Sequence, residues 1–193
     1  MLPTADTITR LHDDSLERWR GAPSREVAPG DNLTSVIRDQ HYCNVVLWDL
    51  EDEARRRDRG DAHVAATKRS IDERNQRRSD LIERIDEMLL AELPARRDGA
   101  EQHSETAGMM IDRLSILSLK IRSMRALAAR RNDAALAAEC AGKLDVLVEQ
   151  RRDLASCFDQ LLADCATGRR FFKVYRQHKV YNDPRLRPAL SAK

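Results

Sequence analysis

The feature that most constrains this chain is the near absence of glycine and proline from long stretches with helical periodicity. Most of the 7 Gly and 6 Pro fall within three short regions, 23–30, 94–108 and 168–188. Both residues disfavour helix interiors, so the stretches between these regions can run as long helices. Apolar residues recur there at spacings of three and four, which predicts amphipathic α-helices. The fold must therefore pack several long helices together.

This pattern predicts five helices. Thr4 is placed to cap a short first helix, and Ser104 or Thr106 is placed to cap the fourth. The fourth helix is apolar over most of its circumference, which is typical of a helix in the centre of a bundle. The predicted helices cover residues 5–20, 32–59, 62–93, 107–130 and 133–166.

Together the helices predict a single all-α domain over residues 1–193. Residues 31–167 form its core, four long helices in an antiparallel bundle, and residues 1–30 form a short N-terminal helix and a loop. The tail at 168–193 contains four aromatic residues, so we expect it to pack on the bundle rather than to extend freely.

Composition narrows the classes of function. With 41% hydrophobic and 34% charged residues, the chain is typical of a folded helical protein rather than a disordered one. The net charge is only +2, and arginine runs alternate with acidic residues, which favours solvated helix faces over nucleic-acid binding. No apolar run reaches membrane-spanning length, and the polar N-terminus excludes a signal peptide. The 4 Cys form no C-x-x-C pair, so we expect them to be reduced thiols in the core of a cytoplasmic protein. The sequence is also compatible with a homo-oligomer.

Several polar side chains project from the apolar faces of the predicted helices. In the second helix Asn44, Glu51 and Arg55 lie inside the apolar arc, with Trp48 at its border. A buried carboxylate is costly unless it is paired or hydrogen-bonded, so Glu51 needs a partner. We therefore expect Asn44, Glu51 and Arg55 to be buried, and Glu51 to contact a basic side chain from another helix.

Charged residues on the other apolar arcs predict a basic interior. Arg78 and Arg151 match one another in a faint internal repeat at an offset of about seventy residues, which either duplication or chance explains. We expect both to approach one interior region, where an excess of positive charge would hold a small anion. In this hypothesis Glu51 and Asn44 orient or activate the ligand, and the other contacts are Trp48, Asp52, Arg55, Lys68, Asp72, Asn75, Arg78, Arg113, Lys120 and Arg151.

Two alternatives stay open. The buried charges can form a structural ion-pair network that only fixes helix register, as in a non-catalytic interaction protein. Alternatively, Glu51-Asp52 and Glu83-x-x-Asp86 resemble parts of the Mg²⁺-binding motif of all-α nucleotide pyrophosphohydrolases of the MazG type, although Arg55 replaces the third acid. There are no Glu-x-x-His repeats and no glycine-rich phosphate loop, so the anion hypothesis includes no metal and no cofactor.

Four segments resemble a bacterial family known as domain of unknown function 4254. They read NVVLWDLEDEAR at 44–55, KRSIDERNQRRSDLIERID at 68–86, ETAGMMIDRLSILSLKI at 105–121 and YRQHKVYNDPRLRP at 175–188, in family order. Two departures are Ala107 in place of proline and Arg187 in place of asparagine. The resemblance implies a helical bacterial protein without an established activity, whose relatives accompany glycosyltransferases of surface-polysaccharide assembly.

The resemblance also marks motif positions, several of which coincide with the residues that helical geometry places inside. In the tail it marks Lys179, Tyr181, Asn182 and Asp183, and we expect this segment to cover the pocket. The leading hypothesis is therefore a protein that binds or acts on a sugar phosphate or nucleotide sugar in surface-polysaccharide metabolism.

Overall fold

The computed structural model describes residues 2–19 and 30–176. Over these residues the chain forms five α-helices, a 3₁₀ turn η1 (Arg57–Arg59) and two short strands. The all-α prediction is confirmed, and the main difference is that the second helix ends several residues earlier than expected. The helices are α1 (Ala5–Arg18), α2 (Leu33–Ala54), α3 (Asp61–Glu92), α4 (Ala107–Ala128) and α5 (Ala134–Ala166), and the strands are β1 (Glu101–Gln102) and β2 (Arg170–Phe171).

Side-chain caps decide where four of the helices begin. Thr4, Asn32, Thr106 and Asp133 each accept a hydrogen bond from a backbone N–H at the start of α1, α2, α4 and α5. Each cap satisfies one of the N–H groups that have no partner inside the helix. After α5, Gly168 adopts a φ of 73°, the left-handed conformation that commonly ends a helix.

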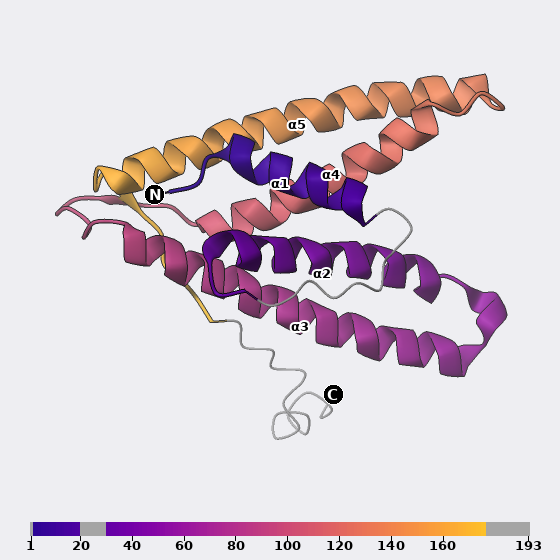
Figure 1. Ribbon diagram of the computed structural model, residues 1–193, viewed down its shortest axis with the longest axis horizontal. Coiled ribbons are helices and arrows are strands. Elements are labelled where there is room, and N and C mark those ends of the chain that lie inside the picture. Colours follow the sequence, from indigo (N-terminus) through magenta and orange to yellow (C-terminus); the bar gives the residue numbers. More distant parts are fainter. Residues whose placement is uncertain (1, 20–29, 177–193) are drawn as a thin grey trace, which may run out of the picture.

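The helices form two antiparallel hairpins, α2–α3 and α4–α5, and α1 packs on α4, α2 and α5 (Figure 1). The main hydrophobic core fills one end of both hairpins and includes Ile37, Ile85, Ile111 and Phe158. Towards the turns that follow α2 and α4 the two hairpins diverge (Figure 1). This divergence leaves parts of α2, α4 and α5 without a covering helix.

The first part of the predicted tail is packed, as expected. β2 pairs in parallel with β1, a contact that the helical pattern did not predict, and Phe172 is buried. Arg176 then forms ion pairs with Glu83 and Glu87 of α3. The remaining predicted site residues, Lys179, Tyr181, Asn182 and Asp183, lie outside the described residues.

Two further expectations concern the cysteines and the membrane. Cys43, Cys140 and Cys165 are buried free thiols, but Cys157 is exposed, so it is not the core residue that we expected. It lines a pocket together with residues of α4 and α5. In the described part of the chain no helix has the length and apolar character needed to cross a membrane.

Candidate ligand-binding site

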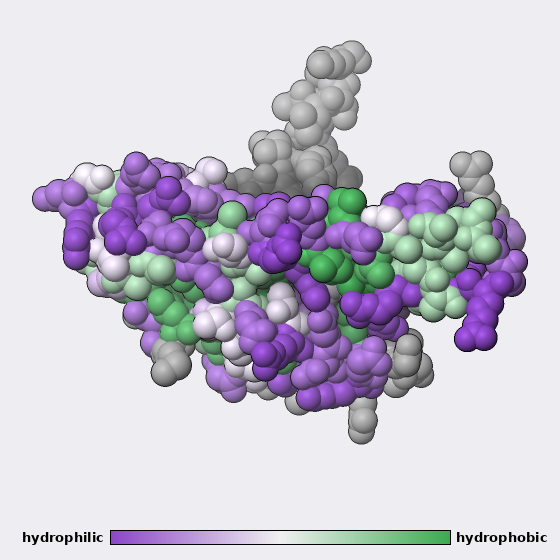
Figure 2. Space-filling view, turned by 90° about the horizontal axis from the view of Figure 1, so that it is seen from above, coloured by the Kyte–Doolittle hydropathy of each residue, from purple (hydrophilic) through white to green (hydrophobic). Residues whose placement is uncertain are grey.

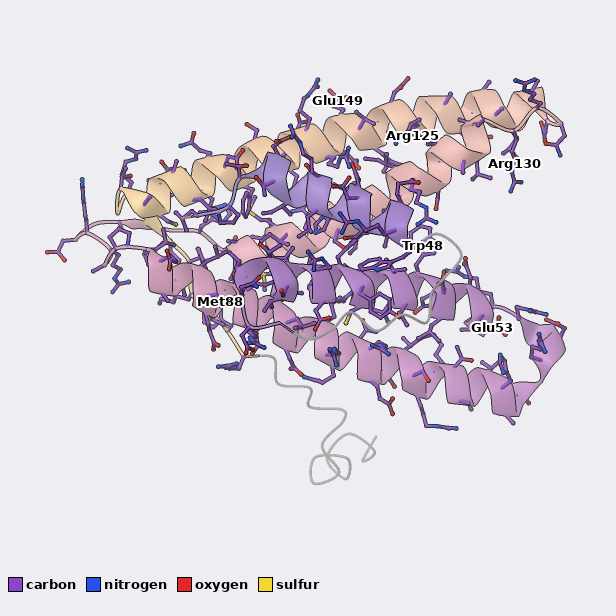
Figure 3. All side chains as sticks on the ribbon, viewed as in Figure 1. Trp48, Glu53, Met88, Arg125, Arg130 and Glu149 are labelled. Atoms are coloured by element: carbon purple, nitrogen blue, oxygen red, sulfur yellow. The ribbon has the colours of Figure 1, made fainter. Side chains whose placement is uncertain are left out.

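A pocket of about 280 Å³ opens between α2, α3 and α4, at the point where the core ends and the hairpins diverge. Figure 3 shows Trp48 on the side of α2 that faces α1 and α4. The helical repeat brings residues 44, 48, 51 and 55 to one side of α2. Seven predicted site residues line the pocket: Asn44, Trp48, Glu51, Asp52, Arg55, Asn75 and Arg78.

Beside this pocket, the carboxylate of Asp112 of α4 lies between the two hairpins. Its side chain is 13% exposed, and Arg78 Nε lies 3.9 Å from Asp112 Oδ1. The same oxygen accepts hydrogen bonds from the amides of Gln40 and Asn44, the latter at 2.9 Å. Burial raises the pKa of Asp112, whereas Arg78 and the two amide hydrogen bonds lower it. Asp112 thus joins α2 and α3 to α4.

Arg78, which lines the pocket, has a hydrogen-bond donor without an acceptor in the described part of the chain. Its Nη1 donates to Asn44 Oδ1 at 3.4 Å, but its buried Nε–H has no hydrogen-bond partner among the described residues. Within the same part of the chain, the side-chain amide of Asn75, which also lines the pocket, has none either. A buried donor without an acceptor costs free energy unless water or a ligand accepts from it. The pocket wall therefore offers hydrogen bonds that the fold does not use.

The burial predictions for α2 are confirmed in part. Asn44 is buried at 3% exposure. Glu51 contacts a basic residue of another helix, since its carboxylate lies 3.9 Å from Lys68 Nζ, but the side chain is 44% exposed. The prediction for Arg55 is wrong, because its side chain is 72% exposed and pairs with Asp52 at 2.7 Å. The reason is that the hairpins diverge along α2, so no helix covers its apolar arc near Arg55.

A chain of buried polar groups leads from the pocket towards α1. The Asn44 amide donates to Ser115 Oγ at 2.9 Å, and Ser115 Oγ lies 2.7 Å from His41 Nδ1. His41 Nε2 lies 3.2 Å from the carbonyl oxygen of His12, and the two rings stack with centroids 4.4 Å apart. Burial lowers the pKa of His41 to about 3, so its ring is neutral. Its Nε2–H therefore donates to the carbonyl, and Nδ1 accepts from Ser115.

Arg151 of α5 lies at the far end of this network. Its Nη1 donates to both carboxylate oxygens of Asp13, at 2.9 and 3.0 Å, and to Ser118 Oγ at 3.3 Å. Burial lowers the pKa of His12 well below its ordinary value, and the positive charge of Arg151 acts in the same direction. Among the described residues Arg151 and Arg78 share no partner. The two arginines lie at opposite ends of this network, so the prediction that they hold one anion together in a single interior region is not confirmed.

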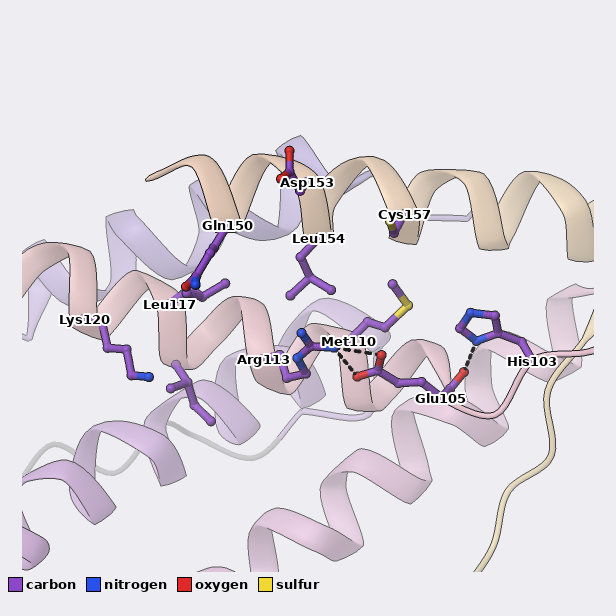
Figure 4. Close-up of a pocket in the computed structure, with 11 residues that line it drawn as sticks. His103, Glu105, Met110, Arg113, Leu117, Lys120, Gln150, Asp153, Leu154 and Cys157 are labelled. Atoms are coloured by element: carbon purple, nitrogen blue, oxygen red, sulfur yellow. Dashed lines mark hydrogen bonds and ion pairs between the residues drawn. The ribbon is translucent and has the colours of Figure 1, made fainter. Parts of the chain in front are cut away.

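Arg113 and Lys120 line a different pocket, of about 670 Å³, between α4 and α5 (Figure 4). Arg113 donates to both oxygens of Glu105 at 2.9 Å. Lys120 has no ion-pair partner in the described ranges. Asp72 is exposed and lines neither pocket. The predicted site residues are thus distributed over several places instead of one.

The predicted excess of positive charge in the interior is wrong. The side chains of Arg55, Lys68 and Arg113 are more than half exposed. Long basic side chains lay their stems on apolar surface and extend the charge to water, whereas a short aspartate on an apolar face cannot. Buried charged residues are instead acidic: Asp39, Glu83, Asp86 and Asp164.

The two halves of the resembled magnesium motif do not meet. Glu51 contacts Lys68, and Asp86 follows Lys68 by eighteen residues in α3, about 27 Å at the rise of an α-helix. Glu83 pairs with Arg176, and Asp86 accepts a hydrogen bond from the backbone N–H of Gly108. Residues 2–19 and 30–176 contain no group of three His, Cys, Asp or Glu placed to hold a metal ion.

Sequence reasoning missed Asp112, Gln40 and His12. Asp112 lies on a helix that is apolar nearly all round, so no single face marked it as internal. A usable signal was the spacing of Asp112, Ser115 and Ser118, three residues apart among the apolar residues of this helix. In a central helix each polar residue faces a neighbouring helix and needs a partner there.

Comparison with known proteins gives one family. A family model described as "Protein of unknown function (DUF4254)" matches residues 34–174, which include α3, α4, α5, all but the first residue of α2, and the pocket between α2, α3 and α4. No curated protein and no solved structure matches the chain. The chemistry of the site must therefore be argued from its own geometry.

Proposed function

We propose that this chain, which belongs to the DUF4254 family of proteins of unknown function, binds a small phosphorylated sugar in the pocket between α2, α3 and α4. The observation that carries the proposal is Arg78, which lines the pocket and whose buried Nε–H lacks a hydrogen-bond partner among the described residues. The planar guanidinium matches the geometry of phosphate oxygens.

The lining supports a sugar phosphate over a simple anion. Two arginines, Arg55 and Arg78, are balanced by two carboxylates, Glu51 and Asp52. A plain anion gains little from such a pocket, whereas sugar hydroxyls hydrogen-bond to carboxylates and amides and the phosphate binds arginine. Trp48 adds an apolar face against which a sugar ring can pack.

The size of the pocket agrees with a ligand of this class. Its volume of about 280 Å³ lies just below the range of small-molecule pockets, about 300–1,000 Å³, as expected for a small ligand. The family resemblance supports a role for such a ligand in surface-polysaccharide metabolism in the cytoplasm.

Thermal melting and calorimetry of the full chain with glucose 1-phosphate, inorganic phosphate and glucose test the proposal. A ligand that binds only the folded state stabilises it, by about 2.7 kcal/mol at one hundred times Kd. We expect glucose 1-phosphate to raise Tm more than either of its parts. If none of the three changes Tm, the pocket is not a sugar-phosphate site, and a structural ion-pair network is the better explanation.

A matched pair of variants on α3 locates the binding. Asn75→Ala removes an amide from the pocket wall, whereas Asp72→Ala removes an exposed side chain one turn away that does not line it. We expect Asn75→Ala to weaken glucose 1-phosphate binding about fivefold, the effect of one hydrogen bond, and Asp72→Ala to leave it unchanged. Equal affinities for the two variants would assign the binding to another part of the chain.

A further inference from the structure

A second pocket, of about 690 Å³, adjoins the proposed sugar-phosphate pocket, and Trp48 lines both. It is not the pocket of about 670 Å³ that Arg113 lines. Its floor is apolar and consists of Met124 from α4 and Val146 and Leu147 from α5. Figure 2 shows green, hydrophobic surface interrupting the hydrophilic surface towards the end of the α4–α5 hairpin. A ligand in the first pocket can therefore extend past Trp48 onto apolar surface without leaving the protein.

Gly142 widens this second pocket. It lies inside α5, where glycine lowers helix stability, and yet a Cβ atom there would have no atom of the described fold within 4 Å. At Gly108, by contrast, a Cβ would lie 2.6 Å from the carbonyl oxygen of Ile82, so close packing of α3 on α4 explains that glycine. Packing inside the protein does not explain Gly142, but space for an occupant of the pocket does.

Two polar groups at the edge of the apolar pocket have no partner in the described ranges. They are the ammonium group of Lys120 and the amide of Gln150. The other cation at the edge, Lys143, is paired with Glu139. An occupant thus meets apolar walls, one indole face, one unpaired cation and one unpaired amide.

Building on the proposed function, we infer that the ligand is a nucleotide sugar. Its sugar phosphate lies at Arg78, and its base lies in the apolar pocket against Trp48. A base has apolar faces that stack on an indole ring and a polar edge that hydrogen-bonds to an amide such as Gln150. Lys120 is the cation available for the second phosphate. An isoprenoid chain would use the apolar walls but not the amide.

The test fills the second pocket without altering the first. Gly142→Leu adds a side chain where the structure has open space, and it improves helix propensity, so the variant keeps its fold. Ala141→Leu is the matched control, because Ala141 is exposed on the next position of α5 and does not line the pocket. Calorimetry of the full chain compares glucose 1-phosphate, UDP-glucose, ADP-glucose, GDP-mannose and farnesyl diphosphate.

We expect at least one nucleotide sugar to bind ten times more tightly than glucose 1-phosphate. Gly142→Leu should abolish this gain and leave the affinity for glucose 1-phosphate unchanged, and Ala141→Leu should alter neither. If the nucleotide sugars bind no better than glucose 1-phosphate, or Gly142→Leu leaves their gain intact, the inference fails and the proposed function stands. Farnesyl diphosphate binding that Gly142→Leu blocks, without nucleotide binding, would assign the pocket to an isoprenoid chain. If no phosphorylated compound binds, both proposals fail.

Discussion

Arg78 and Arg151 hold corresponding places in the two helical hairpins. Each lies on the second helix of its hairpin and donates to a polar side chain of the first, Arg78 to Asn44 and Arg151 to Ser118. Each also faces a carboxylate on a third helix. This shared geometry supports the internal repeat that the sequence suggested.

The two arginines differ in how completely they are satisfied. Arg151 donates to both oxygens of Asp13 at normal hydrogen-bond distances. Arg78 stays 3.9 Å from Asp112, and in the described part of the chain its Nε–H has no acceptor. Arg151 therefore links α5 to α1 and α4, whereas Arg78 retains an N–H donor that a ligand can use. The role of a buried arginine depends on which of its N–H donors lack an acceptor. The position of the arginine in a sequence repeat does not show which donors these are.

The largest expected effect compares the two carboxylates. Asp112→Ala leaves Arg78 without its counter-charge and breaks two amide hydrogen bonds in a buried place, which should cost about 3–5 kcal/mol of unfolding free energy. Asp13 is about half exposed, so Asp13→Ala should cost about 1 kcal/mol or less. Urea unfolding followed by circular dichroism measures both losses of unfolding free energy. Equal losses for the two variants would contradict the expectation that Asp112 stabilises the fold more than Asp13 does.

The second prediction concerns the histidines between the two arginines. The folded state keeps His12 and His41 neutral, whereas the unfolded chain protonates them below its ordinary pKa of 6.5. The contribution of the two histidines to stability is therefore fully present above pH 6.5 and falls as the pH drops below it, by about 1.4 kcal/mol per pH unit for each histidine that stays neutral in the folded state. His12→Leu should remove one of these two contributions and make the decline less steep.

Urea unfolding of wild type and His12→Leu between pH 7 and 4.5 measures that difference. Asp86 acts in the opposite sense, because burial raises its pKa to about 6 and the folded state gains stability as this carboxyl is protonated. It is present in both proteins, so its contribution cancels in the comparison. Parallel pH profiles would mean that His12 is not held neutral by burial.

The smallest expected effect separates the arginines by ligand binding. Arg78→Lys keeps the charge but removes the planar fork and the unused Nε–H, so glucose 1-phosphate affinity should fall about tenfold, or about 1.4 kcal/mol. Arg151→Lys should change this affinity less than about twofold, since Arg151 does not line the pocket. Calorimetry provides the values, and a larger loss for Arg151→Lys would reverse the roles proposed for the two residues.

Helix positions were predictable because their signals are local. The caps Thr4 and Thr106 and the glycine after α5 are recognisable from a few neighbouring residues. Six of the seven predicted residues around the pocket were found for a related reason, since periodicity determines which side of a helix a residue occupies, whereas Asp52 came from the family resemblance. The short pairing of β1 with β2 was missed, because two residues in each strand carry no periodic signal.

Burial depth was not predictable in the same way. Asn44 and Arg55 lie on the same arc of α2, but Asn44 is buried and Arg55 is exposed. Periodicity gives direction around the helix axis, and it contains no information on how far along that axis a neighbouring helix extends. The partner of Arg78 was unpredictable for a similar reason, since Asp112 lies on a helix without a polar face.

By itself the sequence determined the five helices, the central place of α4 and the face of α2 that carries the polar residues. Only the tertiary structure decided that Asp112 faces Arg78, that Arg151 Nη1 donates to Asp13, and that the Nε–H of Arg78 has no acceptor among the described residues. Hydrogen bonds within a helix depend on residues a turn apart, which the sequence specifies directly. Contacts between helices depend on their offset and divergence, which follow from the packing of the whole chain.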